Sequence, residues 1–180
     1  MIRNTEIAEN IASILLDIKA IKLSPKNPFT WASGLRSPIY CDNRIALSFP
    51  DKRTYIKEQI VTTIKKNFTE VEVIAGVATA GIPQGALVAD MLGLPFVYVR
   101  SSTKSHGMTN KIEGKIEKGQ RVVVIEDLVS TGKSSLDAVD ALRAVDADVM
   151  GMVAIFTYGL DIAVDNFESK ECDLIALSDY

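Results

Sequence analysis

The stretch VVVIEDLVSTGKSS, from Val122 to Ser135, contains an apolar strand, two acidic residues, a small polar turn and the start of a helix. Its first four residues are β-branched, as is typical of a strand buried on both faces of a parallel sheet. Glu126 and Asp127 follow where that strand should end, which is where open α/β sheets bind ligands. The turn leads into a helical stripe of apolar residues. Its N–H groups and hydroxyls are therefore expected beside a helix N-terminus, which suits a phosphate.

The turn ends in Gly132-Lys133-Ser134, as the P-loop of nucleoside triphosphatases does, but the rest of that pattern is missing. A P-loop needs another glycine at position 127, where this chain has an aspartate that would repel a triphosphate. Two carboxylates before the turn instead suit a ligand with a diol next to its phosphate, because carboxylates accept hydrogen bonds from ribose hydroxyls. Ribose 5-phosphate has this shape. The alternative is an ordinary strand-to-helix connection with exposed acids and a Ser or Thr helix cap.

The composition indicates a globular protein, and the 180 residues are expected to form a single domain. A net charge of -3 and a pI near 5.2 argue against a general nucleic-acid binder. Two cysteines far apart in sequence indicate neither a disulfide framework nor a zinc site, and fit a reducing cytoplasm. The charged N-terminal helix pattern is neither a signal peptide nor a membrane span. We therefore expect a cytoplasmic protein without nucleic-acid or membrane partners.

Alternating strand and helix patterns predict a doubly wound α/β fold, with a mainly parallel sheet flanked by helices. A first amphipathic helix is expected after Asn4, which should cap it, and a second around residues 55–68. Prolines interrupt residues 24–50, which predicts a small irregular or antiparallel subdomain. The expected parts are thus residues 1–50 as an N-terminal appendage and 70–180 as the α/β core. The expected core strands are 73–77, 96–99, 122–125, 149–156 and 174–177, with helices at 82–92, 134–145 and 162–167.

The opening stretch resembles the phosphoribosyl diphosphate (PRPP) signature of type I phosphoribosyltransferases. In that family the acidic residues bind the ribose hydroxyls and the loop binds the 5-phosphate. The resemblance implies that PRPP is bound by Glu126, Asp127, Leu128, Val129, Ser130, Thr131, Gly132, Lys133 and Ser134. It also implies a short pyrophosphate loop at Thr79, Ala80 and Gly81, although small residues at a tight turn serve packing equally well.

Residues 100–118 form a long polar segment without apolar periodicity, which is typical of a lid or of disorder. Within it, RSSTKSHG at 100–107 resembles the lid loop of orotate phosphoribosyltransferases, with Ser101 in place of a basic residue. The resemblance implies that Arg100, Lys104 and His106 contact PRPP, with Lys104 and His106 catalytic. In the family this lid reaches the neighbouring subunit's site, which implies a homodimer. The alternative is a solvated basic surface loop.

The segment PFTWASGLRSPIYCDNR, residues 28–44, resembles the hood that covers the substrate in orotate phosphoribosyltransferases. The matching residues of the hood are Ser33, Gly34, Ser37 and Pro38. Ala32 replaces a substrate-binding lysine found in one branch of the family. Ser130 occupies the family position that contacts orotate. The aromatic residues of this segment could equally serve only to pack the appendage onto the core.

The resemblance as a whole implies transfer of ribose 5-phosphate from PRPP to orotate, giving orotidine 5′-monophosphate and pyrophosphate in pyrimidine (UMP) biosynthesis. Mg²⁺ is expected mainly on PRPP oxygens, because Mg²⁺ keeps several waters and needs few protein ligands. No protein metal ligand is expected, since His106 is the only histidine and has no partner at metal-ligand spacing. Two alternatives remain: a phosphoribosyltransferase for another base, and a regulator that binds PRPP without turnover.

Overall fold

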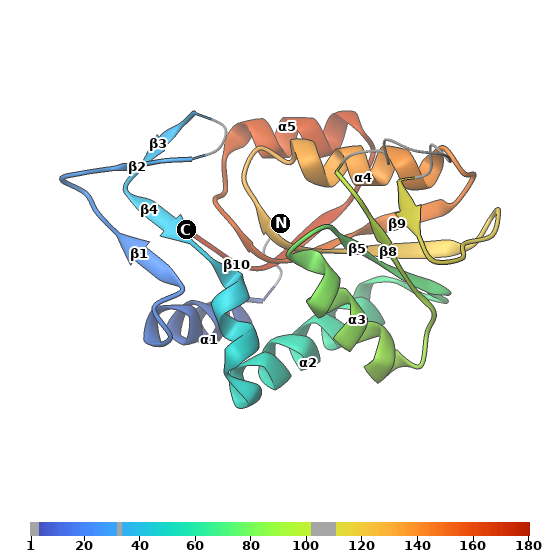
Figure 1. Cartoon of the computed structure of the whole chain (residues 1–180), viewed down its shortest axis with the longest axis horizontal. Coiled ribbons are helices and arrows are strands. Elements are labelled where there is room, and N and C mark those ends of the chain that lie inside the picture. The colour runs from blue at the N-terminus through green and yellow to red at the C-terminus, as the bar shows by residue number, and fades with distance from the viewer. Residues whose placement is uncertain (1–3, 32–33, 102–110) are drawn as a thin grey trace.

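The computed structural model describes residues 4–31, 34–101 and 111–180, which fold around a six-stranded sheet (Figure 1). The strand order is β10-β9-β8-β5-β6-β7, and all neighbours are parallel except the β6–β7 pair. The strands are β5 (Val73–Val77), β6 (Phe96–Val99), β7 (Ile112–Glu113), β8 (Arg121–Val129), β9 (Asp148–Thr157) and β10 (Leu174–Asp179). The predicted doubly wound, mainly parallel sheet is therefore confirmed.

Helices cover both faces of the sheet, as Figure 1 shows. One face carries α1 (Thr5–Asp17), α2 (Pro50–Asn67) and α3 (Gly81–Leu92), and the other carries α4 (Lys133–Arg143) and α5 (Asp161–Ser169). The predicted cap of α1 is confirmed, since the Asn4 Oδ1 accepts a hydrogen bond of 3.1 Å from the Ile7 N–H. Within the described part of the chain, no helix is both long and apolar enough to cross a membrane.

Strand β8 lies in the middle of the sheet and is buried on both faces. Val123 and Ile125 belong to the core beneath α1, α2 and α3, whereas Val122 and Val124 belong to the core beneath α4 and α5. All four residues have no exposed surface, and full burial of each stabilises the fold by about 1.5–3 kcal/mol. The continuous apolar run of the sequence thus fixes the position of the residues that follow it.

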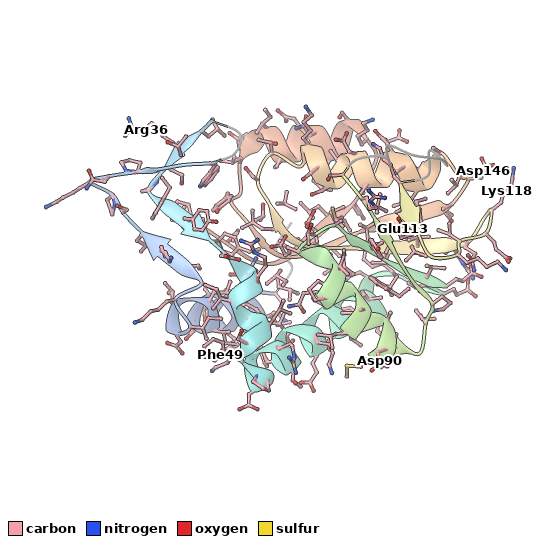
Figure 2. The ribbon with its side chains drawn as sticks, in the orientation of Figure 1. Arg36, Phe49, Asp90, Glu113, Lys118 and Asp146 are labelled. Atoms are coloured by element: carbon pink, nitrogen blue, oxygen red, sulfur yellow. The ribbon has the colours of Figure 1, made fainter. Side chains whose placement is uncertain are left out.

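A small antiparallel subdomain, here called the hood, precedes α2. It comprises β1 (Ile21–Leu23), β2 (Phe29–Thr30), β3 (Arg36–Ser37), β4 (Ile39–Cys41) and the short 3₁₀ helix η1 (Asn43–Ser48). β1 pairs with β4 and β2 with β3, both antiparallel. Figure 2 shows Arg36 in the hood, at the opposite end of the molecule from the Lys118–Asp146 ion pair. Of the two forms expected for residues 24–50, irregular or antiparallel, the structure has antiparallel pairs, and the first of these strands begins earlier, at Ile21.

Strand β7 corrects the predicted range of the lid loop. Ile112 and Glu113 pair with Val99 and Tyr98 of β6, so part of the segment expected to be an irregular loop is a short antiparallel strand. The Arg100 N–H also donates to the Lys111 carbonyl, at 2.8 Å. The segment failed to indicate a strand because only one of the two β7 residues is apolar. The connection that begins at Arg100 is thus closed at its base by a hairpin.

Helix α3 approaches the sheet so closely that glycine is required at its first residue. A Cβ atom on Gly81 would lie 2.5 Å from the carbonyl oxygen of Ile125 in β8. Four residues later, a Cβ on Gly85 would lie 2.7 Å from the ring of Phe96. Gly81 therefore serves packing at this turn, whatever it contributes to a ligand.

We expect Gly81→Ala to destabilise the protein by about 1–3 kcal/mol, because the new methyl group must displace backbone rather than a flexible side chain. Chemical denaturation of the two proteins measures this difference. Ala86→Ser, on the exposed face of the same helix, is the control and should change the stability by less than about 0.5 kcal/mol. A Gly81→Ala protein as stable as the control would contradict the close approach.

Candidate active site

The turn between β8 and α4 leaves the first N–H groups of α4 without a side-chain cap. Gly132 is the N-cap residue, with a φ of 80°, and no side-chain hydrogen bond caps the helix within the described residues. The alternative of a turn with a Ser or Thr helix cap is therefore wrong within the described residues. Unpaired N–H groups at a helix N-terminus form a site for an anion, since the helix dipole is positive there.

Helix α5 supports this turn from behind. The Asn166 side chain donates a hydrogen bond of 2.8 Å to the Thr131 carbonyl. A Cβ atom on Gly132 would lie 2.7 Å from the ring of Phe167, which is too close for any other residue to fit without a shift. A positive φ and a filled space both require glycine at position 132. The turn is thus held in a fixed shape by residues outside the signature.

Glu126 is buried, with 5% of its surface exposed, and both oxygens of its carboxyl group are engaged. Oε1 accepts from the Asp127 N–H at 3.0 Å, and Oε2 accepts from the Ser135 hydroxyl at 2.9 Å. Burial raises the pKa of Glu126 well above its usual value, and the charge of Asp127 raises it further. The hydrogen bond from Ser135 opposes this rise because it favours the ionised form.

Asp127 lies where β8 loses one of its two neighbours. Pairing with β5 ends at Ile125, while pairing with β9 continues to Val129. Beyond that point, the Asp127 carbonyl accepts a hydrogen bond of 2.6 Å from the side chain of Asn43 in the hood. Burial raises the pKa of the Asp127 carboxyl group, whereas hydrogen bonds and the nearby charge of Arg44 lower it. The hood therefore contacts the acid pair directly.

A cavity of about 460 Å³ lies between the hood and the turn. Its lining residues come from the hood, the β8–α4 turn and the end of β9: Trp31, Tyr40, Cys41, Leu128, Ser130, Thr131, Lys133, Ser134 and Tyr158. The Ser130 Oγ is buried and has no hydrogen-bond partner among the described residues. Buried polar atoms in native proteins normally have partners, so an exception of this kind is expected where a ligand binds.

Aromatic residues form one wall of the cavity. The rings of Trp31 and Tyr158 stack with centroids 3.9 Å apart. The Tyr158 hydroxyl accepts from the Cys41 N–H at 3.1 Å, and the Trp31 indole N–H donates to the Ile39 carbonyl at 3.1 Å. Burial raises the pKa of both Tyr158 and Cys41 to about 12, so both are neutral at physiological pH. The contacts of Tyr158 with Trp31 and Cys41 hold the hood against the carboxyl end of β9.

The two turns implied by the resemblance meet at one edge of the sheet. A Cβ on Gly81 would lie 3.5 Å from the Glu126 Cα, so the start of α3 lies directly against the acid pair. Thr79 and Ala80 lie between the end of β5 and the start of α3, and no side chain caps that helix within the described residues. The structure thus brings the short loop and the signature together.

Only the base of the predicted lid belongs to the described residues. Arg100 donates to the Glu113 Oε1 at 3.2 Å, and both side chains are 28% exposed. Figure 2 shows Glu113 near the β6–β7 hairpin. Lys104 and His106 lie outside the described residues, and so does Ser33 of the hood. The roles predicted for these residues stay predictions.

Several residues of the site carry no signal in the sequence stretch that led to it. They are Trp31, Cys41 and Asn43 in the hood, Tyr158 after β9 and Asn166 in α5. Ser135 is the last residue of that stretch, but its hydrogen bond to Glu126 was not expected from it. Tyr158 could have been found, because it follows the strand beside β8 and parallel strands end at the same edge. The others could not, since their roles depend on contacts between segments distant in sequence.

The described residues contain no cluster of three or more His, Cys, Asp or Glu side chains that could hold a metal ion. The site does offer carboxylate oxygen, the ligand type that Mg²⁺ prefers, at Glu126 and Asp127. A site of this kind fits an ion that arrives with its own oxygen ligands on a phosphate. It does not form a protein cage for one.

Glu126 should make the protein less stable at neutral pH than a neutral side chain would. Because its pKa is raised on folding, the stability that it contributes is full below the unfolded value near 4.5 and is lost as the pH rises. We expect Glu126→Gln to have a higher Tm than the wild type at pH 7.5, with the difference vanishing near pH 4. Thermal unfolding at several pH values measures this.

The matched control is Glu72→Gln, because hydrogen bonds from Arg121 lower the pKa of this surface carboxyl group. The expected change in Tm is therefore opposite to that of Glu126→Gln, and Glu72→Gln should have a Tm equal to or below that of the wild type at pH 7.5. A Glu126→Gln protein with no gain over the wild type at pH 7.5 would contradict the account of a disfavoured buried charge.

Comparisons with known proteins agree with this geometry. The family model described as "Phosphoribosyl transferase domain" matches residues 52–179. The orotate phosphoribosyltransferase of Streptococcus mutans is 59% identical over 174 residues, which are 97% of this chain and 83% of the relative. That of Porphyromonas gingivalis is 58% identical over 94% of this chain and 81% of the relative.

A solved structure supports the same assignment. The crystal structure of orotate phosphoribosyltransferase from Aeropyrum pernix has a TM-score of 0.84 and 27% identity, and the match covers 94% of this chain and 93% of that one. The matched region includes the sheet, the two turns and the acid pair described above. The chain therefore belongs to the type I phosphoribosyltransferase family, and within it to the orotate phosphoribosyltransferases.

Proposed function

We propose that the chain transfers ribose 5-phosphate from PRPP to orotate, forming orotidine 5′-monophosphate and releasing pyrophosphate in UMP biosynthesis. The observation that carries this proposal is the acid pair at the end of β8, followed directly by an uncapped turn that lines a cavity closed by the hood. The similarity to orotate phosphoribosyltransferases supports orotate as the base. The alternatives are another base and binding of PRPP without turnover.

In this proposal the sugar phosphate lies at the end of β8. Asp127 and Glu126 accept hydrogen bonds from the two ribose hydroxyls, and the 5-phosphate binds to N–H groups of the turn at 130–134. The positive end of the α4 dipole favours the phosphate charge. The support of the turn by Asn166 and Phe167 means that little reorganisation is needed when the ligand binds.

The base occupies the cavity beneath the hood. The flat wall made by Trp31 and Tyr158 suits a planar aromatic ring, which prefers stacked or edge-on contacts with such side chains. The unpartnered Ser130 hydroxyl supplies a hydrogen-bond donor for an acceptor on the base. The base and the sugar are then adjacent, because Ser130 directly follows β8 and lies three residues after Asp127.

Departure of pyrophosphate leaves positive charge on the sugar, as in other displacements at an anomeric carbon. We assign Thr79, Ala80 and Gly81, together with Arg100, Lys104 and His106, to the leaving pyrophosphate. Each well-placed donor or cation of this kind lowers a barrier by about 2.7–4 kcal/mol. Mg²⁺ on PRPP oxygens supplies further charge neutralisation when bound.

The lid over residues 100–111 closes on the site in this proposal and excludes water from the reacting carbon. The hairpin of β6 and β7 provides the fixed base from which this segment departs. We also propose a homodimer in which the lid reaches the neighbouring subunit's site, and a cytoplasmic location.

One incubation tests the function. With PRPP and Mg²⁺, the protein is expected to form a nucleotide from orotate and not from uracil, hypoxanthine or adenine. Chromatography of the products measures this. If only another base gave a nucleotide, that base would replace orotate as the proposed substrate. Binding of PRPP without any product would favour a regulator that binds PRPP without turnover.

Asp127→Asn is the control, because it removes one carboxylate and leaves the cavity for the base unchanged. We expect it to lower kcat/KM for PRPP at least about tenfold, which corresponds to a loss of about 1.4 kcal/mol. An unchanged kcat/KM for PRPP would count against the role of Asp127 in binding the diol.

A further inference from the structure

Ser135 places a buried hydroxyl beside the acid pair, and neither the signature nor the proposed reaction gives it a role. It is the third residue of α4 and is 1% exposed. Its hydroxyl donates to the Glu126 Oε2 at 2.9 Å, while the Glu126 Oε1 accepts from the Asp127 N–H at 3.0 Å. Two donors from different elements therefore fix the Glu126 carboxyl group between β8 and α4.

Helix α4 itself does not need a hydroxyl at this position. Gly132 is the N-cap residue of α4, and no side chain within the described residues caps the helix. The Ser135 hydroxyl is therefore not used as a cap. Serine is also a poorer helix former than alanine. What distinguishes serine from alanine here is the hydrogen bond to Glu126.

The arrangement leaves the Glu126 carboxyl group ready for a ligand. An ionised carboxylate can accept about four hydrogen bonds; Glu126 accepts two from Ser135 and the Asp127 N–H, and the Asp127 carboxyl group lies within hydrogen-bonding reach of it. The remaining lone pairs lie on a carboxyl group that can no longer rotate freely. In a buried site, fixing such a group in advance strengthens the contacts that it makes with a ligand.

We propose that Ser135 is a positioning residue for the sugar of the phosphoribosyl donor, because its hydroxyl holds Glu126 in the orientation that accepts the ribose diol. Ser135 acts through Glu126 and touches neither PRPP nor the base. The inference rests on the proposed function, since it takes Glu126 as a contact of PRPP. It adds to that function a residue from α4 and a predictable response to pH.

The response to pH follows from the ionisation of Glu126. Its pKa is raised by burial and by Asp127, and the hydrogen bond from Ser135 lowers it. Without that bond the pKa rises further, and the neutral form, which is the poorer acceptor, persists to higher pH. Among the described residues, the charged or titratable groups beside the acid pair are Arg44 and Cys41 from the hood and Tyr158 after β9, and Lys133 of α4 lines the adjoining cavity.

Three of these groups, Cys41, Tyr158 and Arg44, do not produce the same signal. Cys41 and Tyr158 have pKa values of about 12 and stay neutral between pH 5.5 and 8.5. The Arg44 guanidinium stays charged, because its pKa is raised by Asp42. The phosphate groups of PRPP titrate in this range, but they do so equally for every variant. A ratio of dissociation constants between variant and wild type therefore isolates the acid pair.

The test is the Kd of PRPP with saturating Mg²⁺, measured by calorimetry from pH 5.5 to 8.5 for the wild type, Ser135→Ala and Ser135→Thr. For Ser135→Ala we expect the Kd to rise about tenfold where Glu126 titrates. The pH at which affinity falls should move upward, since the lost hydrogen bond favours the ionised form of Glu126. Ser135→Thr keeps the hydroxyl and should remain within about threefold of the wild type.

A purely structural role for Ser135 predicts the reverse order, because threonine adds a methyl group to a packed site and alanine does not. Affinity lower for Ser135→Thr than for Ser135→Ala, or an unshifted pH dependence in Ser135→Ala, would overturn the proposal. If Ser135→Ala does not fold, Ser135→Cys provides the same test, since its thiol is a weaker donor of similar size and should give a smaller upward shift. No binding of PRPP by the wild type would overturn the proposed function instead, which separates the two failures.

Discussion

The burial of β8 between two hydrophobic cores is the constraint on which the site depends. Alternate residues of the strand pack against opposite layers of helices, so the strand cannot slide or turn without exposing one set of them. The residues that follow the apolar run, 126–134, therefore lie at the carboxyl edge of the sheet. This packing sets where the acid pair and the turn begin, and contacts from Ser135, Asn166 and Phe167 then fix their shape.

Burial disfavours the ionised forms of the two carboxyl groups at this edge of the sheet. For Glu126, the charge of its neighbour Asp127 makes this worse. The surrounding structure compensates with specific donors: Ser135 from α4, the Asp127 N–H and, for the strand end, the side chain of Asn43. A carboxylate pair held in this way is poorly solvated without a ligand, which is the condition under which hydroxyl groups of a sugar are bound well.

The sequence predicts the sheet and the signature because both depend on patterns that are local. The four β-branched residues before Glu126 indicate a buried strand, and Asn4 marks the start of α1 correctly. Strand β7 was missed because Ile112–Glu113 is too short to carry a period of two. The position of Tyr158 at the sheet edge could have been predicted, but the contacts of Asn43 and Ser135 could not, since both depend on distances that only the tertiary fold sets. Propensity and pattern contain no such information.

The central claim is that a ribose phosphate binds at the end of β8, and a crystal structure with ribose 5-phosphate tests it most directly. This ligand carries only the diol and the 5-phosphate, so it probes the signature without the base or the pyrophosphate. The account predicts the phosphate at the N–H groups of residues 130–134, with ring hydroxyls about 2.5–3.0 Å from the carboxyl oxygens of Glu126 and Asp127. A ligand bound elsewhere, or bound with its hydroxyls directed away from both acids, would contradict it.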